Sequence, residues 1–282
     1  MNTQNKVNKL MGFDLIDFNE LAWNAHQRES ANKNNFSYWY PRIANKNSKF
    51  KTPKSVIIQF TKYERELINK YYEGGNEHND EIKRMFEYKF TQELDQLKDS
   101  KTLFIKNGTF SNKFDFGMCT TENKQDRSQL IENFLDINYT AQLYGASGST
   151  EMIVREFIES NDEETIYGGM PLRTEFRLFY DFDTHQVMDI VNYWDVDYML
   201  DNGNFRNDDD ETTLSKSKDR INFQYQANKD TIIQHMKDNV DKKCDLDGQW
   251  SVDFMMKGDD IYLIDMAIAT NSTYFTGENH DF

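Results

Sequence analysis

Cysteines and long apolar runs are both scarce in this sequence of 282 residues. The two cysteines, Cys119 and Cys244, form no CxxC pair and no disulfide framework, so nothing requires an oxidising compartment. No stretch approaches the roughly 18 apolar residues that a membrane-spanning helix needs. The first residues, MNTQNKVNKLMGF, contain no apolar core of a secretory signal. We therefore expect a cytoplasmic protein that does not enter a membrane.

Several familiar catalytic patterns are also missing. The sequence has no GxxxxGK(S/T) phosphate loop, no GxGxxG fingerprint and no HRD element of protein kinases. Its five histidines are scattered, without HExxH or another zinc-binding spacing. These absences exclude a P-loop protein and argue against a protein kinase or a zinc hydrolase.

Acidic side chains outnumber basic ones, 48 to 33, which gives a formal net charge of −15. This balance argues against a general nucleic-acid surface, because phosphate backbones are bound by clustered Lys and Arg. The acidic side chains are concentrated in residues 181–210, whereas most lysines precede residue 125. Such an asymmetry fits two lobes that face each other across a cleft, and it fits simple solvation of exposed faces equally well.

Hydrophobic periodicity divides the chain near residue 100. Helices dominate the first hundred residues, apart from the short β-branched strand SVIIQF at 55–60. Antiparallel strands dominate the rest, and SNKFDFGMC at 111–119 is predicted to return beside the strand TLFIKNGTF as a hairpin. The helices are predicted over residues 63–72, 81–97, 126–144 and 229–242, and the further strands over 151–160, 171–183, 185–194, 250–256 and 260–269.

These elements predict an α+β fold in which antiparallel sheets are covered by helices. We expect a helix-rich N-terminal domain over residues 1–100, followed by two lobes over 101–155 and 156–282. No series of strand–glycine–helix units is present, which argues against a doubly wound nucleotide-binding fold.

Three charged residues, Arg173, Glu175 and Arg177, alternate with apolar neighbours in PLRTEFRLFYDFD. The two-residue period of a strand places all three on the same face of the sheet. Charges that become buried need partners, and Arg binds phosphates and carboxylates through paired hydrogen bonds. The pattern therefore predicts either an anion clamp or a solvated sheet face with cross-strand ion pairs.

Each of the last two strands carries one aspartate in an apolar run, Asp253 in VDF and Asp265 in LID. A turn at KGDD places Asp253 opposite Ile264 or Asp265, so the two carboxylates can meet. Neighbouring carboxylates repel unless a cation joins them, and Mg²⁺ binds carboxylates together with phosphate oxygens. We predict either a magnesium site, with Asn271 as a further oxygen ligand, or a structural salt bridge.

Two lysines flank the turn at Asn107-Gly108. Lys106 leaves the apolar strand TLFI, and Lys113 follows in the predicted return strand. An ammonium at the end of an apolar strand can bind phosphates, although most lysines beside a turn are simply exposed. The loop GASGST at 145–150 has the composition of a flexible loop that covers phosphates, or of an ordinary connector.

Taken in order, the segments FIKNG, GASGST, VREFIE, LRTEFRLFY, WSVDFM and YLIDMA resemble the motifs of the ATP-grasp superfamily. The resemblance covers roughly residues 101–272. It is greatest to the chaperone family that helps assemble eukaryotic translation initiation factor two, and to a phage and bacterial clade marked by two arginines and a lysine. It implies a nucleotide cleft between an N-lobe over 101–155 and a C-lobe over 156–282.

The resemblance also implies roles for the residues singled out above. ATP phosphates would contact Lys106, adenine would lie against a hinge, and Mg²⁺ would be held by Asp253 and Asp265. Lys113 and Glu175 are further candidates for nucleotide binding. Many members carry an Asn two residues after the last acidic ligand, whereas this chain has Ala267, so Asn271 would substitute or a second metal site would be weakened. The hinge would be Glu156, Phe157 and Ile158, and the arginines facing the phosphates or an acyl-phosphate would be Arg177 and Arg173.

The leading hypothesis from the sequence is a Mg-ATP-dependent ligase that activates a carboxylate as an acyl-phosphate for attack by an amine. Its substrate would be a protein, a peptide or a small amino acid. A second hypothesis is an ATP-binding assembly chaperone or phage-type interaction protein without turnover. A third is nucleotidyl transfer as in RNA ligases, which requires a Lys-x-x-Gly spacing that Lys106-Asn107-Gly108 misses by one residue.

Overall fold

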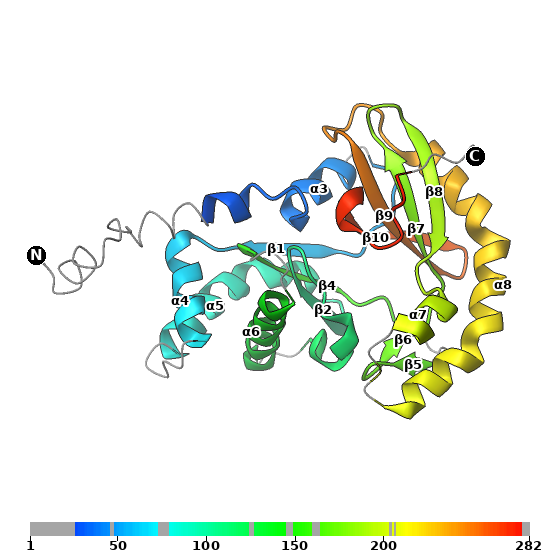
Figure 1. Ribbon diagram of the computed structural model, residues 1–282. Helices are drawn as coiled ribbons and strands as arrows, with labels where there is room; N and C mark the ends of the chain where they lie inside the picture. The colour runs from blue at the N-terminus through cyan, green and yellow to red at the C-terminus, as the bar shows by residue number, and fades with distance from the viewer. Residues whose placement is uncertain are drawn as a thin grey trace, which may run out of the picture.

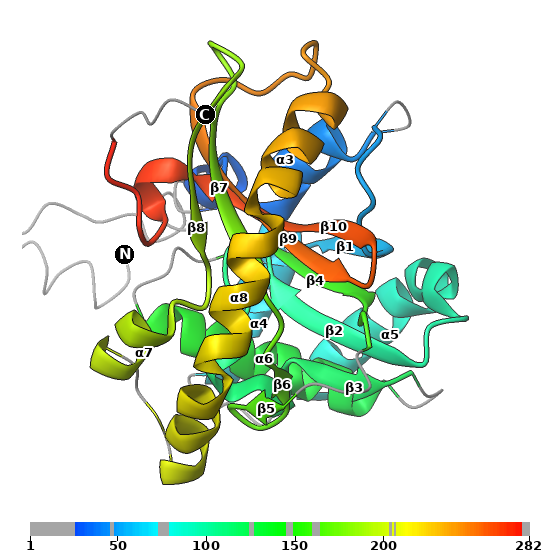
Figure 2. The ribbon, with the colours of Figure 1, turned by 90° about the vertical axis from the view of Figure 1, so that its right-hand side faces the viewer.

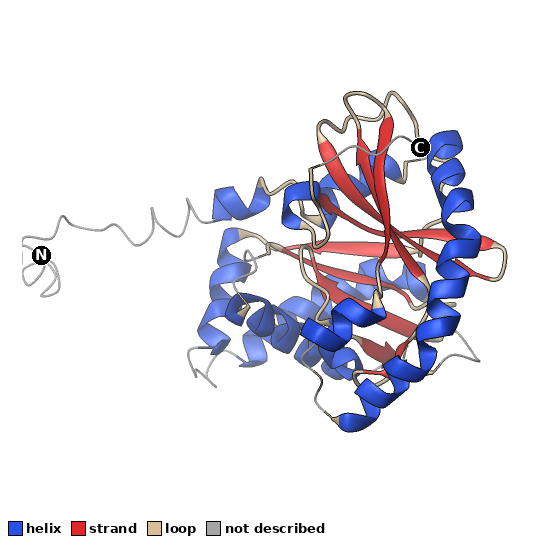
Figure 3. Ribbon diagram, turned by 45° about the vertical axis from the view of Figure 1, so that its right-hand side comes forward, coloured by secondary structure: helices blue, strands red, loops and turns tan. Residues whose placement is uncertain are grey.

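Two four-stranded antiparallel sheets, a small hairpin and a set of covering helices make up the computed structural model, an α+β fold (Figure 1). The strands lie toward the middle of the molecule, with helices around them (Figure 3). The described residues are 26–45, 48–72, 79–123, 127–144, 149–159, 164–202, 205 and 207–277.

The first sheet combines one strand from the first hundred residues with three strands that follow. Leu103 and Ile105 pack into a core with the covering helices, so Lys106 lies on the opposite face, toward the second sheet. The strands, in sheet order, are β1 (Ser55–Gln59), β4 (Glu151–Glu156), β2 (Thr102–Asn107) and β3 (Thr120–Glu122). The helical elements packed on this sheet are α4 (Lys62–Tyr72), α5 (Asn79–Glu93), η2 (Leu94–Leu97) and α6 (Ser128–Leu143).

The second sheet is built from the C-terminal half of the chain. Helix α8 (Asp208–Asn239) packs on its β7–β8 side and crosses its whole height (Figure 2). Helix α3 (Phe36–Ile43) contributes Phe36, Trp39 and Ile43 to the same core. The strands, in sheet order, are β10 (Asp260–Ile268), β9 (Gln249–Lys257), β7 (Glu175–Asp181) and β8 (Gln186–Asn192).

Short elements connect or follow the strands of the two sheets. The hairpin of β5 and β6 packs against one end of α8, and its turn has Tyr167, Gly168 and Gly169 at positive φ. The connecting elements are η3 (Lys113–Met118), β5 (Thr165–Ile166), β6 (Met170–Pro171), α7 (Val196–Asn202) and η4 (Ala269–Asn271). No described helix combines the length and apolarity that a bilayer crossing requires.

Most strands of the second half are confirmed, but the predicted return strand at 111–119 is wrong. Residues 113–118 form the 3₁₀ helix η3, and β3 is the strand that pairs with β2 on that side. The backbone N–H of Phe116 donates to the carbonyl of Tyr167, 2.8 Å away, rather than to a neighbouring strand. Asn112 adopts a left-handed conformation at φ 47, which turns the chain out of the extended path.

The predicted start of the last helix is also wrong. The helix predicted over 229–242 is the second half of α8, which already begins at Asp208 within the run RNDDDE. Asn207 caps it by accepting a hydrogen bond from the N–H of Asp210 at 2.8 Å. Four acidic residues in the first turn, Asp208 to Glu211, stabilise the positive end of the helix dipole.

Residues 1–100, predicted as a separate N-terminal domain, contribute a strand to the first sheet. Strand β1, from the segment assigned to an N-terminal domain, is hydrogen-bonded along β4 from Ser55 to Gln59. The three segment boundaries stay a prediction. Residues 145–148 of the loop lie outside the described residues, and its described end, Ser149 and Thr150, is buried.

Candidate functional site

Three adjoining cavities of about 110, 400 and 550 Å³ lie along the junction of the two sheets. We call them the hinge, polar and outer compartments, in that order. Lys113 and Tyr193 line all three, so the compartments form one continuous cleft. Although the protein has a net charge of −15, the cleft gathers five cationic side chains: Lys106, Lys113, Arg155, Arg173 and Arg177.

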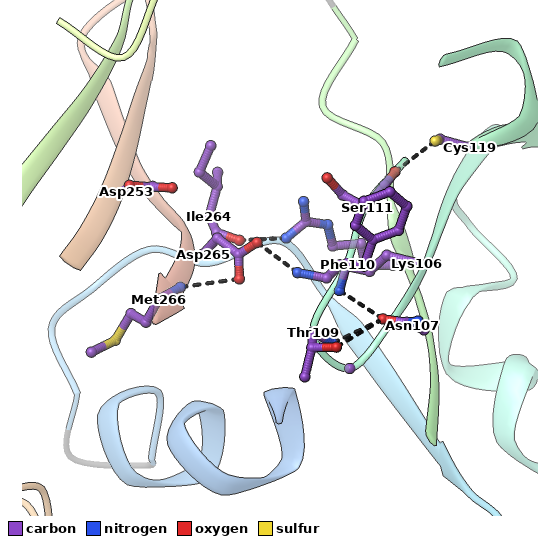
Figure 4. A network of polar contacts seen from close by, with 12 residues as sticks. Lys106, Asn107, Thr109, Phe110, Ser111, Cys119, Asp253, Ile264, Asp265 and Met266 are labelled. Carbon is purple, nitrogen blue, oxygen red and sulfur yellow. Dashed lines mark hydrogen bonds and ion pairs between the residues drawn. The ribbon is translucent and has the colours of Figure 1, made fainter. Parts of the chain in front are cut away.

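An ion pair joins the two sheets in the polar compartment. Lys106 Nζ, from β2, lies 2.6 Å from Asp265 Oδ2, from β10 (Figure 4). The lysine side chain is 2% exposed and the aspartate side chain 33% exposed. Burial alone would raise the pKa of Asp265, but Lys106 and Arg155 outweigh it and hold that pKa below its usual value. The carboxylate is therefore anionic at neutral pH.

A β-bulge decides which residue faces Asp253. The register of β9 and β10 shifts between Leu263 and Asp265, so Asp253 pairs with Asp265 and not with Ile264. The displaced carbonyl of Ile264 accepts a hydrogen bond from Arg155 Nη1. Of the two registers that the sequence allowed, the bulge thus selects the one that brings the two carboxylates together.

Asp253 is engaged by an arginine from the neighbouring strand. Arg177 Nε and Nη2 donate to Asp253 Oδ1 and Oδ2, both at 2.8 Å, in a bidentate pair. Burial lowers the pKa of Arg177, but Asp253 more than compensates, so the pKa is raised overall. The third nitrogen, Nη1, lies 3.5 Å from the carbonyl of Thr273, at the entrance to the outer compartment.

Lys113 occupies the junction of the three compartments. Its Nζ lies 3.8 Å from the ring centroid of Tyr193 and 4.8 Å from that of Trp194. Among the described residues, this ammonium lies over the rings of Phe114, Tyr193 and Trp194 and forms no ion pair. Burial, together with the charge of Arg177, lowers the pKa of Lys113 to about 8.

Glu175, at the start of β7, lines the hinge compartment near Lys113. Burial raises the pKa of Glu175 to about 7, against the opposing effect of Lys113. The two groups therefore sit in the cleft with pKa values close to neutral, which is common where a site handles charged ligands.

The other two members of the predicted arginine strand separate along the cleft. Arg173 precedes β7 and lines the hinge compartment, with Nη1 3.0 Å from Met255 Sδ and its guanidinium 5.6 Å from the ring centroid of Phe157. Arg177 lines the polar and outer compartments. The three charged residues thus face one cleft but not one compartment.

The three residues predicted as a hinge line the same cavity. Glu156, Phe157 and Ile158 line the hinge compartment, and Glu156 Oε1 accepts a hydrogen bond from the N–H of Lys54 at 2.9 Å. Phe157 packs edge-on against Phe116, with ring centroids 5.8 Å apart. Apolar and aromatic side chains form much of the remaining wall: Phe104, Trp194, Met170, Pro171 and Met255.

The turn after Lys106 is held in place by buried polar groups. Asn107 Oδ1 accepts from the N–H groups of Thr109 and Phe110, at 2.9 and 2.6 Å (Figure 4). Glycine is required at 108, since an added Cβ would lie 2.3 Å from the Glu151 carboxylate. Asn271, in η4, lines the polar compartment beside Ala267.

Sequence reasoning missed one central residue, Arg155. It lies in the same VREF segment as the hinge, lines the hinge compartment, and raises the positive potential around Asp265. Burial lowers the pKa of Arg155, while Asp265 and Glu175 raise it. An arginine directly after the apolar residues 152–154 gives the same kind of contrast that identified Asp253, and it could have been recognised.

The donor set suits magnesium bound together with phosphates, rather than a cage made of protein ligands alone. Asp253 and Asp265 are cross-strand neighbours, and Mg²⁺ commonly uses one or two carboxylates plus substrate phosphates. Both carboxylates are paired with cations, Arg177 and Lys106. Among the described residues, no group of three or more His, Cys, Asp or Glu side chains is placed to hold a metal.

Comparison with known proteins finds similarity at the level of structure alone. No protein-family model matches the chain, and no curated protein matches its sequence. C-terminally truncated Cdc123 from Schizosaccharomyces pombe is similar with a TM-score of 0.45 and 14% identity, over 85% of each chain. D-alanine–D-alanine ligase from Bacillus anthracis complexed with ATP has a TM-score of 0.36 and 11% identity, over 89% of this chain and 60% of the ligase.

A third similar structure is a RimK domain protein ATP-grasp from Sphaerobacter thermophilus, with a TM-score of 0.35 and 11% identity. The match covers 86% of this chain and 61% of the RimK domain protein. This chain therefore spans about three fifths of the length of that protein and of the D-alanine–D-alanine ligase. The chain is thus similar in structure, at 11–14% identity, to Cdc123, to the D-alanine–D-alanine ligase and to the RimK domain protein.

Proposed function

We propose that the cleft binds ATP with magnesium, with adenine in the hinge compartment and the phosphates in the polar compartment. One observation carries this proposal: a compartment with aromatic and apolar side chains in its wall adjoins the polar compartment, and the two share Lys113 and the cross-strand pair Asp253 and Asp265. A flat base is accommodated by apolar walls, and phosphates by ammonium and guanidinium groups. Lys106, Lys113 and Arg177 would face the phosphates.

Asp253 and Asp265 would hold the magnesium ion, which would neutralise charge on the phosphates when bound. Binding would require each carboxylate to exchange its present cation partner, Arg177 or Lys106, for the metal. The freed guanidinium and ammonium would then be available to phosphate oxygens. Because both carboxylates would bind the metal, loss of either aspartate should weaken the binding of Mg-ATP.

The reaction that such a site supports is ligation at a carboxylate. A substrate carboxylate oxygen attacks the γ-phosphorus, the bond to the β,γ-bridging oxygen breaks, and ADP leaves. An amine nitrogen then attacks the acyl carbon, the C–O bond to phosphate breaks, and the amine loses a proton. Arg177 and Lys113 would stabilise the charge that develops on the transferred group, and burial in the cleft would strengthen that effect.

A matched pair of variants tests the nucleotide site. Asp265→Asn should abolish the thermal stabilisation that Mg-ATP gives, because it removes one carboxylate of the metal site. Asp260→Asn is the control, since Asp260 lies in the same hairpin and pairs with Lys51 at 2.6 Å but faces solvent. Equal stabilisation of both variants by Mg-ATP would contradict the metal assignment. Melting without nucleotide shows whether each variant is folded.

Binding without turnover is a second candidate function. It is favoured by the occupation of both Asp253 oxygens by Arg177, and by Ala267 at a position where an amide ligand was expected. ADP release in the presence of mixed peptides and amino acids distinguishes the two candidates. Nucleotidyl transfer is disfavoured, because Lys106 is 2% exposed and paired with Asp265, whereas a lysine nucleophile needs a free neutral amine.

A further inference from the structure

The outer compartment has a composition unlike the rest of the cleft. Its volume is about 550 Å³, and aromatic side chains form most of its wall. Three of them, Phe114, Tyr144 and Tyr198, are 39%, 69% and 43% exposed, so the compartment opens to the surface. Rings that remain exposed around a cavity indicate a ligand of apolar character. The aromatic members are Phe110, Phe114, Tyr144, Tyr193, Trp194, Tyr198, Phe205 and Tyr274.

The charge in this compartment is entirely of one sign. Lys113 and Arg177 stand at its inner end, and its described lining contains no Asp or Glu. Arg177 is already paired with Asp253, whereas the Lys113 ammonium contacts ring faces. A cation that is buried against aromatic rings retains hydrogen-bond donors for an anion. The compartment therefore suits a ligand with one anionic group and a large apolar group.

We propose that the outer compartment binds the carboxyl end of a polypeptide whose last residue is aromatic or large and apolar. The terminal carboxylate would face Lys113, next to the polar compartment, and the side chain would lie among Tyr198, Phe205 and Tyr274. This rests on the proposed function in one respect: the carboxylate is the group that ATP would activate.

A polypeptide end fits the charge pattern better than a free amino acid does. A free amino acid carries an ammonium group, which needs an acidic partner when it is buried, and the described lining offers none. In a peptide that nitrogen is an uncharged amide. The preceding residues of the polypeptide would pass Tyr144 and Tyr198, which line this compartment and are exposed.

Peptide probes test the proposal on the full-length chain. N-acetyl-glycyl-phenylalanine with a free carboxylate should bind in calorimetric titrations, with and without a non-hydrolysable Mg-ATP analogue. The same peptide as a C-terminal amide, N-acetyl-diglycine and free phenylalanine should each bind about tenfold more weakly or worse, as expected when one charged or apolar contact is lost. Equal binding of the amide or of free phenylalanine would overturn the proposal.

Variants locate the peptide site. Tyr198→Ala and Lys113→Met should each weaken peptide binding by about tenfold or more, whereas Tyr198→Phe, which keeps the ring, should restore it. Phe223→Ala is the control, because Phe223 is 74% exposed on α8 and lines none of the three compartments. Unchanged peptide affinity in folded Tyr198→Ala and Lys113→Met would place the ligand elsewhere.

The outcome for nucleotide separates this inference from the proposed function. If the ATP analogue binds and the peptide does not, the peptide proposal fails alone. If the peptide binds and the analogue does not, the nucleotide proposal fails, and the outer compartment remains a binding site for a carboxyl end.

Discussion

At the scale of single residues, the main feature of the cleft is that buried and partly buried charged side chains form ion pairs. Lys106 and Asp265 neutralise each other across the two sheets, as do Arg177 and Asp253 within the second sheet. Lys113 differs, since its ammonium lies against Tyr193 and Trp194 and its pKa falls to about 8. A buried cation with aromatic neighbours is poised to bind an anion and loses that ability when it is neutral.

This pKa gives a pH dependence with a definite sign. Protonated Lys113 binds the peptide carboxylate, so affinity should be full below pH 8 and should fall by up to about tenfold per unit as the pH rises above 8. Calorimetric titrations of the peptide between about pH 6.5 and 9.5, a range that brackets the Lys113 pKa of about 8, measure this pH dependence. The dependence above pH 8 should vanish in Lys113→Met.

Glu175 is the group that could imitate this effect, because its pKa is raised to about 7 and its ionisation adds negative charge to the cleft. Asp253, Asp265 and Arg177 also face Lys113, and Asp265 stays ionised across this range because Lys106 and Arg155 hold its pKa below the usual value. Glu175 raises the pKa of Lys113, so Glu175→Gln should shift the loss of affinity to lower pH. A loss that persists in this variant identifies Lys113, whereas its disappearance would assign the effect to Glu175.

At the scale of elements, the ends and irregularities of strands and helices place the site. The bulge at Ile264 brings Asp265 opposite Asp253, and the 3₁₀ helix η3 carries Lys113 into the cleft. Helix α8 begins far earlier than its apolar pattern indicated, because Asn207 and the acidic first turn satisfy its N-terminus. Local polar interactions therefore decide element boundaries that periodicity leaves open.

The cap of α8 yields a stability prediction. Asn207→Ala removes the side-chain oxygen that accepts from Asp210 N at 2.8 Å and should reduce the free energy of unfolding by about 1 kcal/mol. Urea denaturation followed by far-UV circular dichroism measures the loss. Asn202→Ala, at the end of α7, serves as a comparison away from any N-cap. A change at Asn207 no larger than at Asn202 would contradict the capping role.

At the scale of the whole molecule, α8 ties the two cores together. Its first half places Leu214 and Ile221 in the core with the first sheet, and its second half places Ile232 and Met236 in the core with the second sheet. A helix continuous across two cores transmits loss of packing from one to the other. The cleft lies between those cores, so its geometry depends on both.

Core truncations test this coupling. Ile221→Ala and Ile232→Ala each remove a fully buried side chain and should each cost about 2–5 kcal/mol of unfolding free energy. Because α8 is continuous, each variant should still unfold in one transition. Near-UV signals from the buried Trp194 and Trp250, which lie in different cores, should coincide with the far-UV signal. Two separated transitions would show that the sheets unfold independently.

The sequence by itself determined the elements whose patterns are local. Period-two alternation identified the strands of the second half, and helical spacing identified α4, α5 and α6. The aspartates stood out because each interrupts an apolar strand, and the turn at KGDD limited Asp253 to two possible partners. Arg177 and Lys106 were recognised by the same kind of contrast between a charge and its apolar neighbours.

Only the tertiary structure decided how these residues combine. Whether Lys106 was exposed beside a turn or buried in an ion pair depended on Asp265, 159 residues away, which lies on a different sheet. The β-bulge at Ile264 decides which residue pairs with Asp253. The hydrogen bond from Phe116 N–H to the carbonyl of Tyr167 helps to set the path of residues 111–119. Charge pairing between distant strands costs chain entropy and desolvation that no local pattern records, so the cleft emerges only when both cores are packed.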